Sequence, residues 1–250
     1  MANLAYWAFA ARAVQSRGRS GGSIEWGQGR VILRVIHGRG GPGQLEAVAG
    51  ALRGTLAPAP AVGQSLARFH LGHRAIVAEG GAAAGNAAAS DATARDGAPD
   101  DMDIGLISCW ASAEEAAAAD RRGTSPLAIA RTRLRDLTVE HFEIDETVLR
   151  EVGRRARLLR IATGQFSKPG SDKEMLDLLR QRVPNIGSPM VEAHIGRRMV
   201  GREVRITFIS TWFEAPSGRD LRDAFWTDIA LRYDSFDVRV YQTIPITGDR

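Results

Sequence analysis

Short apolar runs rich in branched residues recur along the chain and predict β-strands. A run at residues 31–38 has a counterpart at 157–164, and a second run at 63–77 has one at 187–200. A third pair, 104–110 and 206–212, ends in Ser-x-Trp both times, and a fourth, 137–142 and 236–241, completes each set. With a helix expected after the first and third runs, each set follows the order strand, helix, strand, strand, helix, strand. We therefore predict that the chain contains one domain twice.

This order of elements predicts the fold class. It is typical of the ferredoxin-like split βαβ arrangement, an α+β fold whose antiparallel sheet carries both helices on one face. The other face of the sheet must also be covered, and two units can cover it by pairing face to face. We predict a tandem duplication of a ferredoxin-like βαββαβ unit whose antiparallel sheets pair into an α+β barrel. The pairing can occur within one chain or, in a homodimer, between two.

The domain boundaries follow from changes in composition. We expect residues 1–30 to be a flexible N-terminal extension, 31–145 the first barrel domain, 146–156 a linker and 157–245 the second barrel domain. The segment at 80–100 is rich in Ala, Gly and Asp, and we interpret it as a loop insertion in the first domain.

Composition excludes several function classes. The 250 residues are 44% hydrophobic, enough for the cores of two small domains. Of 33 basic residues only Lys168 and Lys173 are lysines, and the arginines are scattered among acids, so we expect no nucleic-acid partner. No run approaches the roughly 20 apolar residues of a membrane span, so we expect no membrane partner. A single cysteine, Cys109, excludes an intrachain disulfide and favours a cytoplasmic protein.

Four kinds of polar or aromatic residue recur at matching positions of the two copies. Alternate side chains of a strand share a face, so the histidine and arginine four residues apart in each second strand point the same way. The arginine of each first strand stands between apolar neighbours that we expect to pack on the helices, which directs it toward the cavity. The candidate ligand-binding residues are Arg34, Arg74, Trp110, Arg160, Arg198 and Trp212, and the candidate catalytic residues are His70 and His194. Such a pocket suits a small aromatic or anionic molecule.

The same residues also have structural interpretations. A strand-end tryptophan is commonly a core anchor, and Arg74 or Arg198 can pair with an acid such as Glu192 on its own face. The histidines can be hydrogen-bonded core residues, because no His/Asp/Ser constellation is visible around them. We expect no metal site. The glycines of residues 38–43 fit a dinucleotide-binding pattern, but no acidic residue follows at the required distance, so we expect no NAD.

The segments Ser108-Cys-Trp110-Ala-Ser112-Ala-Glu114 and Ser125-Pro126-Leu127, with the predicted order of elements, resemble the antibiotic-biosynthesis-monooxygenase-like members of the dimeric α+β barrel superfamily. Ser210-Thr-Trp212 carries the resemblance in the second copy. The resemblance covers most of residues 31–245. It implies a barrel that takes a small molecule, with activities that range from cofactor-independent oxygenation of aromatic polyketides to haem degradation.

The haem-degrading constellation is incomplete in this chain. The resemblance places Trp110 and Trp212 on the family's strand-end tryptophan, but the first strand offers Arg34 or Arg160 where those enzymes have an asparagine. The helices expected after the tryptophans contain no histidine. We therefore expect an oxygenase without a cofactor. Binding of haem through His70 or His194 is not excluded by the sequence. The alternative is a noncatalytic barrel that binds a ligand or a partner protein.

Overall fold

The computed structural model describes residues 31–56, 66–74, 101–149, 155–166, 168, 170–183, 186, 189–214 and 232–244. The first half contains β1 (Ile32–Gly40), α2 (Pro42–Leu56), β2 (Leu66–Arg74), β3 (Met102–Trp110), α3 (Ala113–Arg121), α4 (Pro126–Arg131) and β4 (Arg135–Leu149). The second half contains β5 (Leu158–Phe166), α5 (Ser171–Arg182), β6 (Met190–Val200), β7 (Glu203–Trp212) and β8 (Ser235–Ile244). The predicted N-terminal extension and the predicted insertion at 80–100 lie outside the described residues.

Serine side chains begin the two short helices of the first half. The Ser112 side chain accepts a hydrogen bond from the Glu115 backbone amide and begins α3, and Ser125 does the same for Ala128 at the start of α4. These bonds satisfy amides that have no partner within the helix. The helices therefore begin where the motifs with Ser112 and Ser125 stand in the sequence.

The eight strands form one closed antiparallel barrel, in the order β1-β3-β2-β8-β5-β7-β6-β4. Each half contributes four neighbouring strands in the same relative order, β4-β1-β3-β2 and β8-β5-β7-β6, which is the ferredoxin-like order. The halves join where β2 pairs with β8 and where β4 pairs with β6. The predicted α+β barrel is confirmed, and its two sheets pair within one chain. That the halves arose by duplication stays a prediction.

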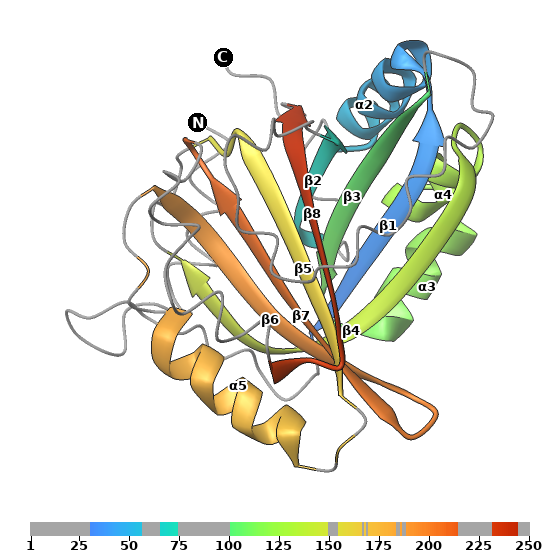
Figure 1. Cartoon of the computed structure of the whole chain (residues 1–250). Coiled ribbons are helices and arrows are strands. Elements are labelled where there is room, and N and C mark those ends of the chain that lie inside the picture. Colours follow the sequence, from blue (N-terminus) through green and yellow to red (C-terminus); the bar gives the residue numbers. More distant parts are fainter. Residues whose placement is uncertain are drawn as a thin grey trace, which may run out of the picture.

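Helices cover the barrel on two sides (Figure 1). α2, α3 and α4 flank the first half, and α5 lies on the opposite side of the molecule. One apolar core lies between the first sheet and its helices, around residues such as Leu52 and Leu106, and another lies under α5, around Met175 and Phe208. A third fills the barrel itself with the side chains Leu33, Val35, Ile107, Cys109, Phe142, Leu159, Ile161, Ile209 and Tyr241.

The faces of β1 and β5 are opposite to our prediction. Leu33 and Leu159 belong to the core inside the barrel, so Arg34 and Arg160 point into the helix layers. We had expected the leucines to face the helices. The alternation of side chains along β1 was correctly identified, but both faces of the strand are buried, and an apolar residue suits either side.

The linker predicted at 146–156 is partly strand. β4 continues to Leu149, and its last residues pair with β6 as far as Glu192. The register shifts between Ile144 and Glu146, which marks a bulge. This extension lengthens the seam between the halves, and it covers part of the site described below.

Candidate functional site

The strand registers place polar side chains at both ends of the barrel, on either side of its apolar middle. β6 and β7 run antiparallel, with Glu192 opposite Thr211 at one end and Arg198 opposite Arg205 at the other. We call the first the histidine end, formed by His70, Cys109, Thr147, Glu192, His194 and Thr211. We call the second the arginine end, formed by His37, Glu140, Gln165, Arg198, Glu203, Arg205, Asp237, Arg239 and Tyr241.

At the histidine end, His70 faces a buried carboxylate from the other half of the chain. The distance between His70 Nε2 and Glu192 Oε1 is 2.5 Å. The Glu192 side chain is only 3% exposed, whereas that of His70 is 21% exposed. A carboxylate bound to one ring nitrogen fixes both the orientation of the imidazole and the position of its proton. His70 is therefore an oriented imidazole that solvent can reach.

The second predicted catalytic histidine contacts the same carboxylate. His194 Nε2 lies 3.8 Å from Glu192 Oε1, and its Nδ1 lies 3.0 Å from Thr147 Oγ1. The sulfur of Cys109 is 4.0 Å from His194 Nε2. Thr211 Oγ1 is buried at this end and has no hydrogen-bond partner among the described residues. The structure thus brings the candidate histidines of the two halves together on one acid.

The two histidines occupy equivalent strand positions but differ in exposure. β4 extends alongside β6, and its Thr147 pairs with His194, which is 2% exposed. On the other seam, the pairing of β2 with β8 begins at Leu71 and Ile244, one residue past His70. The extension of β4 therefore buries His194, whereas the His70 side chain is 21% exposed.

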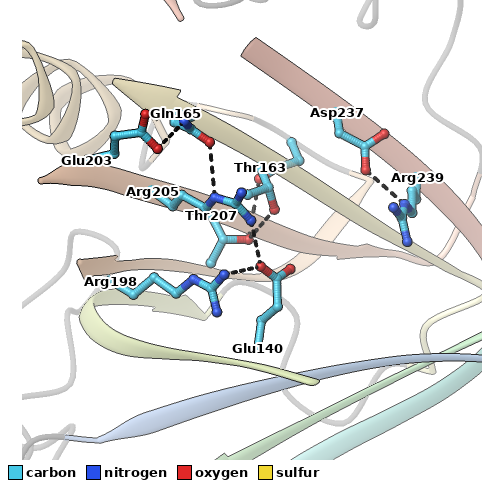
Figure 2. Close-up of polar contacts among 10 residues, drawn as sticks. Glu140, Thr163, Gln165, Arg198, Glu203, Arg205, Thr207, Asp237 and Arg239 are labelled. Atoms are coloured by element: carbon cyan, nitrogen blue, oxygen red, sulfur yellow. Dashed lines mark hydrogen bonds and ion pairs between the residues drawn. The ribbon is translucent and has the colours of Figure 1, made fainter. Parts of the chain in front are cut away.

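The arginine end is held by a chain of ion pairs and hydrogen bonds (Figure 2). Glu140 of β4 accepts from Arg198 at 2.7 Å and from Arg205 at 3.1 Å. Arg205 also donates to Gln165, which donates in turn to Glu203. Arg198 thus pairs with an acid, as its structural interpretation expected, but the acid is Glu140 and not the example Glu192, and the guanidinium also lies over the Phe142 ring. These contacts connect the first half of the barrel with the second.

A neutral histidine lies beside this chain of contacts. His37 Nδ1 is 2.8 Å from the Tyr241 hydroxyl. Burial, helped by the nearby Arg239 guanidinium, lowers the pKa of His37 to about 4. The Tyr241 ring lies against Gly105, where an added Cβ would come within 2.6 Å of ring atoms, and at Gly72 an added Cβ would come within 2.7 Å of the Gln242 carbonyl oxygen and 2.8 Å of the Tyr241 Cβ. Glycine at position 105 therefore leaves room for the ring inside the barrel.

Arg34 and Trp110 connect the sheet to a helix instead of lining the barrel. Both terminal nitrogens of Arg34 donate to Asp120 of α3, at 2.8 and 3.0 Å, and its Nε donates to His141 at 2.9 Å. The guanidinium lies 5.8 Å from the centre of the Trp110 ring. Burial lowers the pKa of His141, and the Arg34 charge lowers it further. These residues therefore pack the sheet of the first half against α3.

The second half repeats part of this arrangement. Trp212 Nε1 donates to Ser210 Oγ at 2.9 Å, as Trp110 Nε1 donates to Ser108 Oγ at 3.0 Å. Arg160 is buried, which lowers its pKa to about 10, and the Tyr233 hydroxyl lies close enough to influence it. Our eight candidate residues therefore separate: His70, His194 and Arg198 face the barrel interior, and Arg34, Trp110, Arg160 and Trp212 face the helices. The Arg74 side chain is outside the described part of the chain.

Sequence reasoning gave Glu192 only the role of an ion-pair partner and overlooked Thr147. Glu192 stands two residues before His194, so its face on β6 was readable, but its contact with His70 depends on closure of the barrel. Within the described ranges, no three His, Cys, Asp or Glu side chains are arranged to hold a metal ion. None of the described helices has the length and apolar character to cross a membrane.

A groove of about 470 Å³ lies along the pairing of β4 with β6. It is lined by Ile32, His141, Phe142, Glu143, Asp172, Arg197, Arg198, Met199 and Val204. The histidine-end residues do not line it. The groove is therefore separate from the acid and the two histidines.

Comparison with solved structures identifies the fold. A protein from Fusobacterium nucleatum, provisionally named a monooxygenase, superimposes with a TM-score of 0.58 at 10% identity, covering 87% of this chain and 94% of that one. A similarly named protein from Lactobacillus acidophilus gives 0.55 at 9% identity, with 87% and 95% covered. An anthrone oxidase-like protein gives 0.53 at 12% identity, with 90% and 95% covered. No family model and no curated protein matches the sequence. The chain therefore has the fold of the monooxygenase-like α+β barrel proteins.

Proposed function

We propose that this chain is a cofactor-independent oxygenase that acts on a small aromatic or anionic molecule at the histidine end of the barrel. The observation that carries the proposal is the contact between His70 and the buried Glu192. An imidazole that is oriented by a carboxylate and open to solvent is suited to proton transfer. The fold, which resembles monooxygenase-like proteins, supports the same class of reaction.

The proposed chemistry begins with proton removal. With its proton on Nε2 and directed at Glu192, His70 has its basic lone pair on Nδ1. This nitrogen takes a proton from an acidic carbon or hydroxyl group of the substrate. The electron pair stays on the substrate, and the carbon that carries the charge adds to dioxygen, which is the oxidant. The resulting peroxide takes the proton back from His70 and loses water, so that one oxygen atom stays on the substrate as a carbonyl group and the other leaves as water. Glu192 stabilises the imidazolium that forms, as a carboxylate does for a protonated histidine.

The proposal divides the candidate residues by place. His70 transfers the proton, and the buried His194 contacts the Glu192 carboxylate that orients His70. Arg34, Arg160, Trp110 and Trp212 act through the packing of the sheet against its helices, because that is where their side chains lie. Arg74 stays a candidate for binding the substrate anion. We place the reaction in the cytoplasm without a cofactor.

A second candidate function is a noncatalytic barrel that binds a small molecule or a partner protein. Two observations favour it. Apolar side chains fill the middle of the barrel, and the groove along β4 and β6 is separate from the histidine end. In this case the ligand lies against groove residues such as Arg197 and Met199.

Oxygen uptake distinguishes the two functions. Anthrone is the first probe, because one protein of similar fold is described as anthrone oxidase-like. The protein is treated with a chelator, and dioxygen consumption and anthrone binding are measured for the wild type, His70→Gln and His37→Gln. We expect His70→Gln to lower kcat by at least about 100-fold, the usual contribution of a positioned base. His37→Gln, changed at the opposite end of the barrel, should keep wild-type activity.

Each outcome decides between the proposals. Uptake that depends on His70 supports the oxygenase. Binding without uptake, lost in a variant of the groove such as Arg197→Ala, supports the noncatalytic function. Uptake that is unchanged in His70→Gln would contradict the role of this residue.

A further inference from the structure

His70 and His194, which stand at corresponding strand positions of the two halves, converge on one carboxylate oxygen from opposite walls of the barrel. His70 Nε2 lies 2.5 Å from Glu192 Oε1, and His194 Nε2 lies 3.8 Å from the same atom. β2 and β6 stand four places apart in the eight-stranded closed order, so the contact between His70 and Glu192 spans the barrel. The pair with His70 is a hydrogen bond, whereas the distance from His194 allows only a weaker electrostatic contact. The acid is therefore held between two imidazoles that are not equivalent.

The proton positions follow from the hydrogen-bond partners. The hydrogen bond to Glu192 Oε1 places the proton of His70 on Nε2, and we assign His194 the same tautomer, with its Nε2–H directed toward that oxygen. The Nδ1 atom of His194 is then an acceptor, and Thr147 Oγ1, at 3.0 Å, donates to it. The order of the contacts is Thr147, His194, Glu192, His70. Each member fixes the orientation of the next, as the third member of a catalytic triad fixes its histidine.

We propose that the two halves have divided one task, in which His70 exchanges the proton and Thr147, His194 and Glu192 are positioning residues that hold its tautomer. The effect of these residues on catalysis rests on the oxygenase function proposed above, whereas their effect on the tautomer of His70 does not. The strand pairing explains the division. The extension of β4 brings Thr147 onto His194 and buries it, whereas the described part of β8 ends at Ile244, opposite Leu71, and does not reach His70.

Exposure agrees with this division of roles. The His70 side chain is 21% exposed, and those of His194 and Glu192 are 2% and 3% exposed. A group that exchanges protons with a solute must be reachable, whereas a group that fixes a tautomer works best where water cannot compete for its hydrogen bonds. His70 and His194 thus occupy equivalent strand positions, but one is partly exposed to solvent and the other is buried.

Histidine-selective nitrogen NMR tests the positioning without a substrate. We expect the wild type to show His70 and His194 with the proton on Nε2. Glu192→Gln should convert His70 to a mixture of tautomers, since the amide can present either an oxygen or an NH₂ group. Thr147→Val removes the donor at nearly constant shape and should alter the His194 signals, and Thr147→Ser should restore them. Glu203→Gln, which changes a carboxylate at the arginine end, should leave both histidines as in the wild type.

The kinetic readout uses the same variants with the anthrone probe. We expect Glu192→Gln to lower kcat about 100-fold and Thr147→Val about 10-fold, with KM within about twofold, because positioning residues typically contribute factors of 10 to 100. Thr147→Ser should recover most of the loss. A His70 tautomer that is unchanged in Glu192→Gln would overturn the proposal, as would His194 signals that are unchanged in Thr147→Val.

The two proposals fail separately. If anthrone is not turned over but the tautomers respond as expected, the oxygenase proposal fails, and the proposal that Thr147, His194 and Glu192 hold the tautomer of His70 stands. If anthrone is turned over through His70 but the tautomers do not change in the Glu192 and Thr147 variants, only the proposal about these positioning residues fails. Urea denaturation of each variant identifies those that do not fold, and the conservative change at Thr147 then decides the question.

Discussion

Replacing His37 tests whether the arginine end of the barrel holds a neutral imidazole. Burial is the main reason that the pKa of His37 falls from 6.5 to about 4, and Arg239 contributes. Below pH 6.5 the unfolded chain takes up a proton that the folded chain does not. This contribution to stability is therefore fully present above pH 6.5 and is lost as the pH falls from 6.5 toward 4. The loss is about 1.4 kcal/mol per pH unit, or about 2 kcal/mol at pH 5.

Urea denaturation near neutral pH and at about pH 5 measures this loss. In His37→Gln the side chain does not titrate, and its amide can still bond the Tyr241 hydroxyl. The fall in the free energy of unfolding between the two pH values should be smaller than in the wild type by about 2 kcal/mol. Comparing the same two pH values in each protein cancels the contributions of other titrating groups.

Tyr241→Phe is the matched control for the cause of the shift. It removes the hydroxyl that contacts His37 but keeps the ring that helps to bury it. Because burial is the largest cause, the pH dependence of this variant should stay near that of the wild type. An equal pH dependence in the wild type and His37→Gln would refute a neutral, buried His37. A loss of the pH dependence in Tyr241→Phe would attribute the shift to the hydrogen bond instead.

Three further predictions concern the framework around the site. Asp120→Asn should lower the free energy of unfolding by about 3 kcal/mol in urea, because it leaves the buried Arg34 charge without its carboxylate; a loss below about 1 kcal/mol would contradict this. Gly105→Ala should cost about 1–3 kcal/mol, since its Cβ would meet the Tyr241 ring, whereas Gly50→Ala in α2, with open space around it, should stabilise by up to about 1 kcal/mol. Sedimentation equilibrium should give the 27.0 kDa mass of one chain, because the closed barrel uses the sheet edges that a second chain would pair with; a stable dimer would show another contact surface.

The order of the elements was predictable from the sequence because it depends on local patterns. The apolar runs and the two Ser-x-Trp motifs gave the ferredoxin-like order in both halves, and the structure contains these strands in that order. Alternation along a strand also predicted that His70 and Arg74 share a face, as do Glu192 and His194. Each of these inferences concerns residues within a few positions of one another, where backbone geometry alone fixes the direction of side chains.

The orientation of the first strands was beyond the sequence. Arg34 stands between apolar neighbours on β1, and alternation shows that it points away from Leu33 without showing which side holds the helices. Both sides are apolar here, because one packs against helices and the other fills the barrel. The decisive partner of Arg34 is Asp120, which lies on α3. An ion pair between elements so far apart in the chain leaves no local pattern.

The sequence by itself determined the repeated order of elements, the pairs of residues that share a strand face, and the resemblance to monooxygenase-like barrels. Only the tertiary structure decided which polar groups meet. His70 and Glu192 are 122 positions apart, and they touch because the two sheets close into one barrel. β4 continues for four residues past the bulge between Ile144 and Glu146, and this extension covers His194. Contacts across a closed barrel depend on how sheets pair, and sheet pairing is set by the packing of the whole molecule.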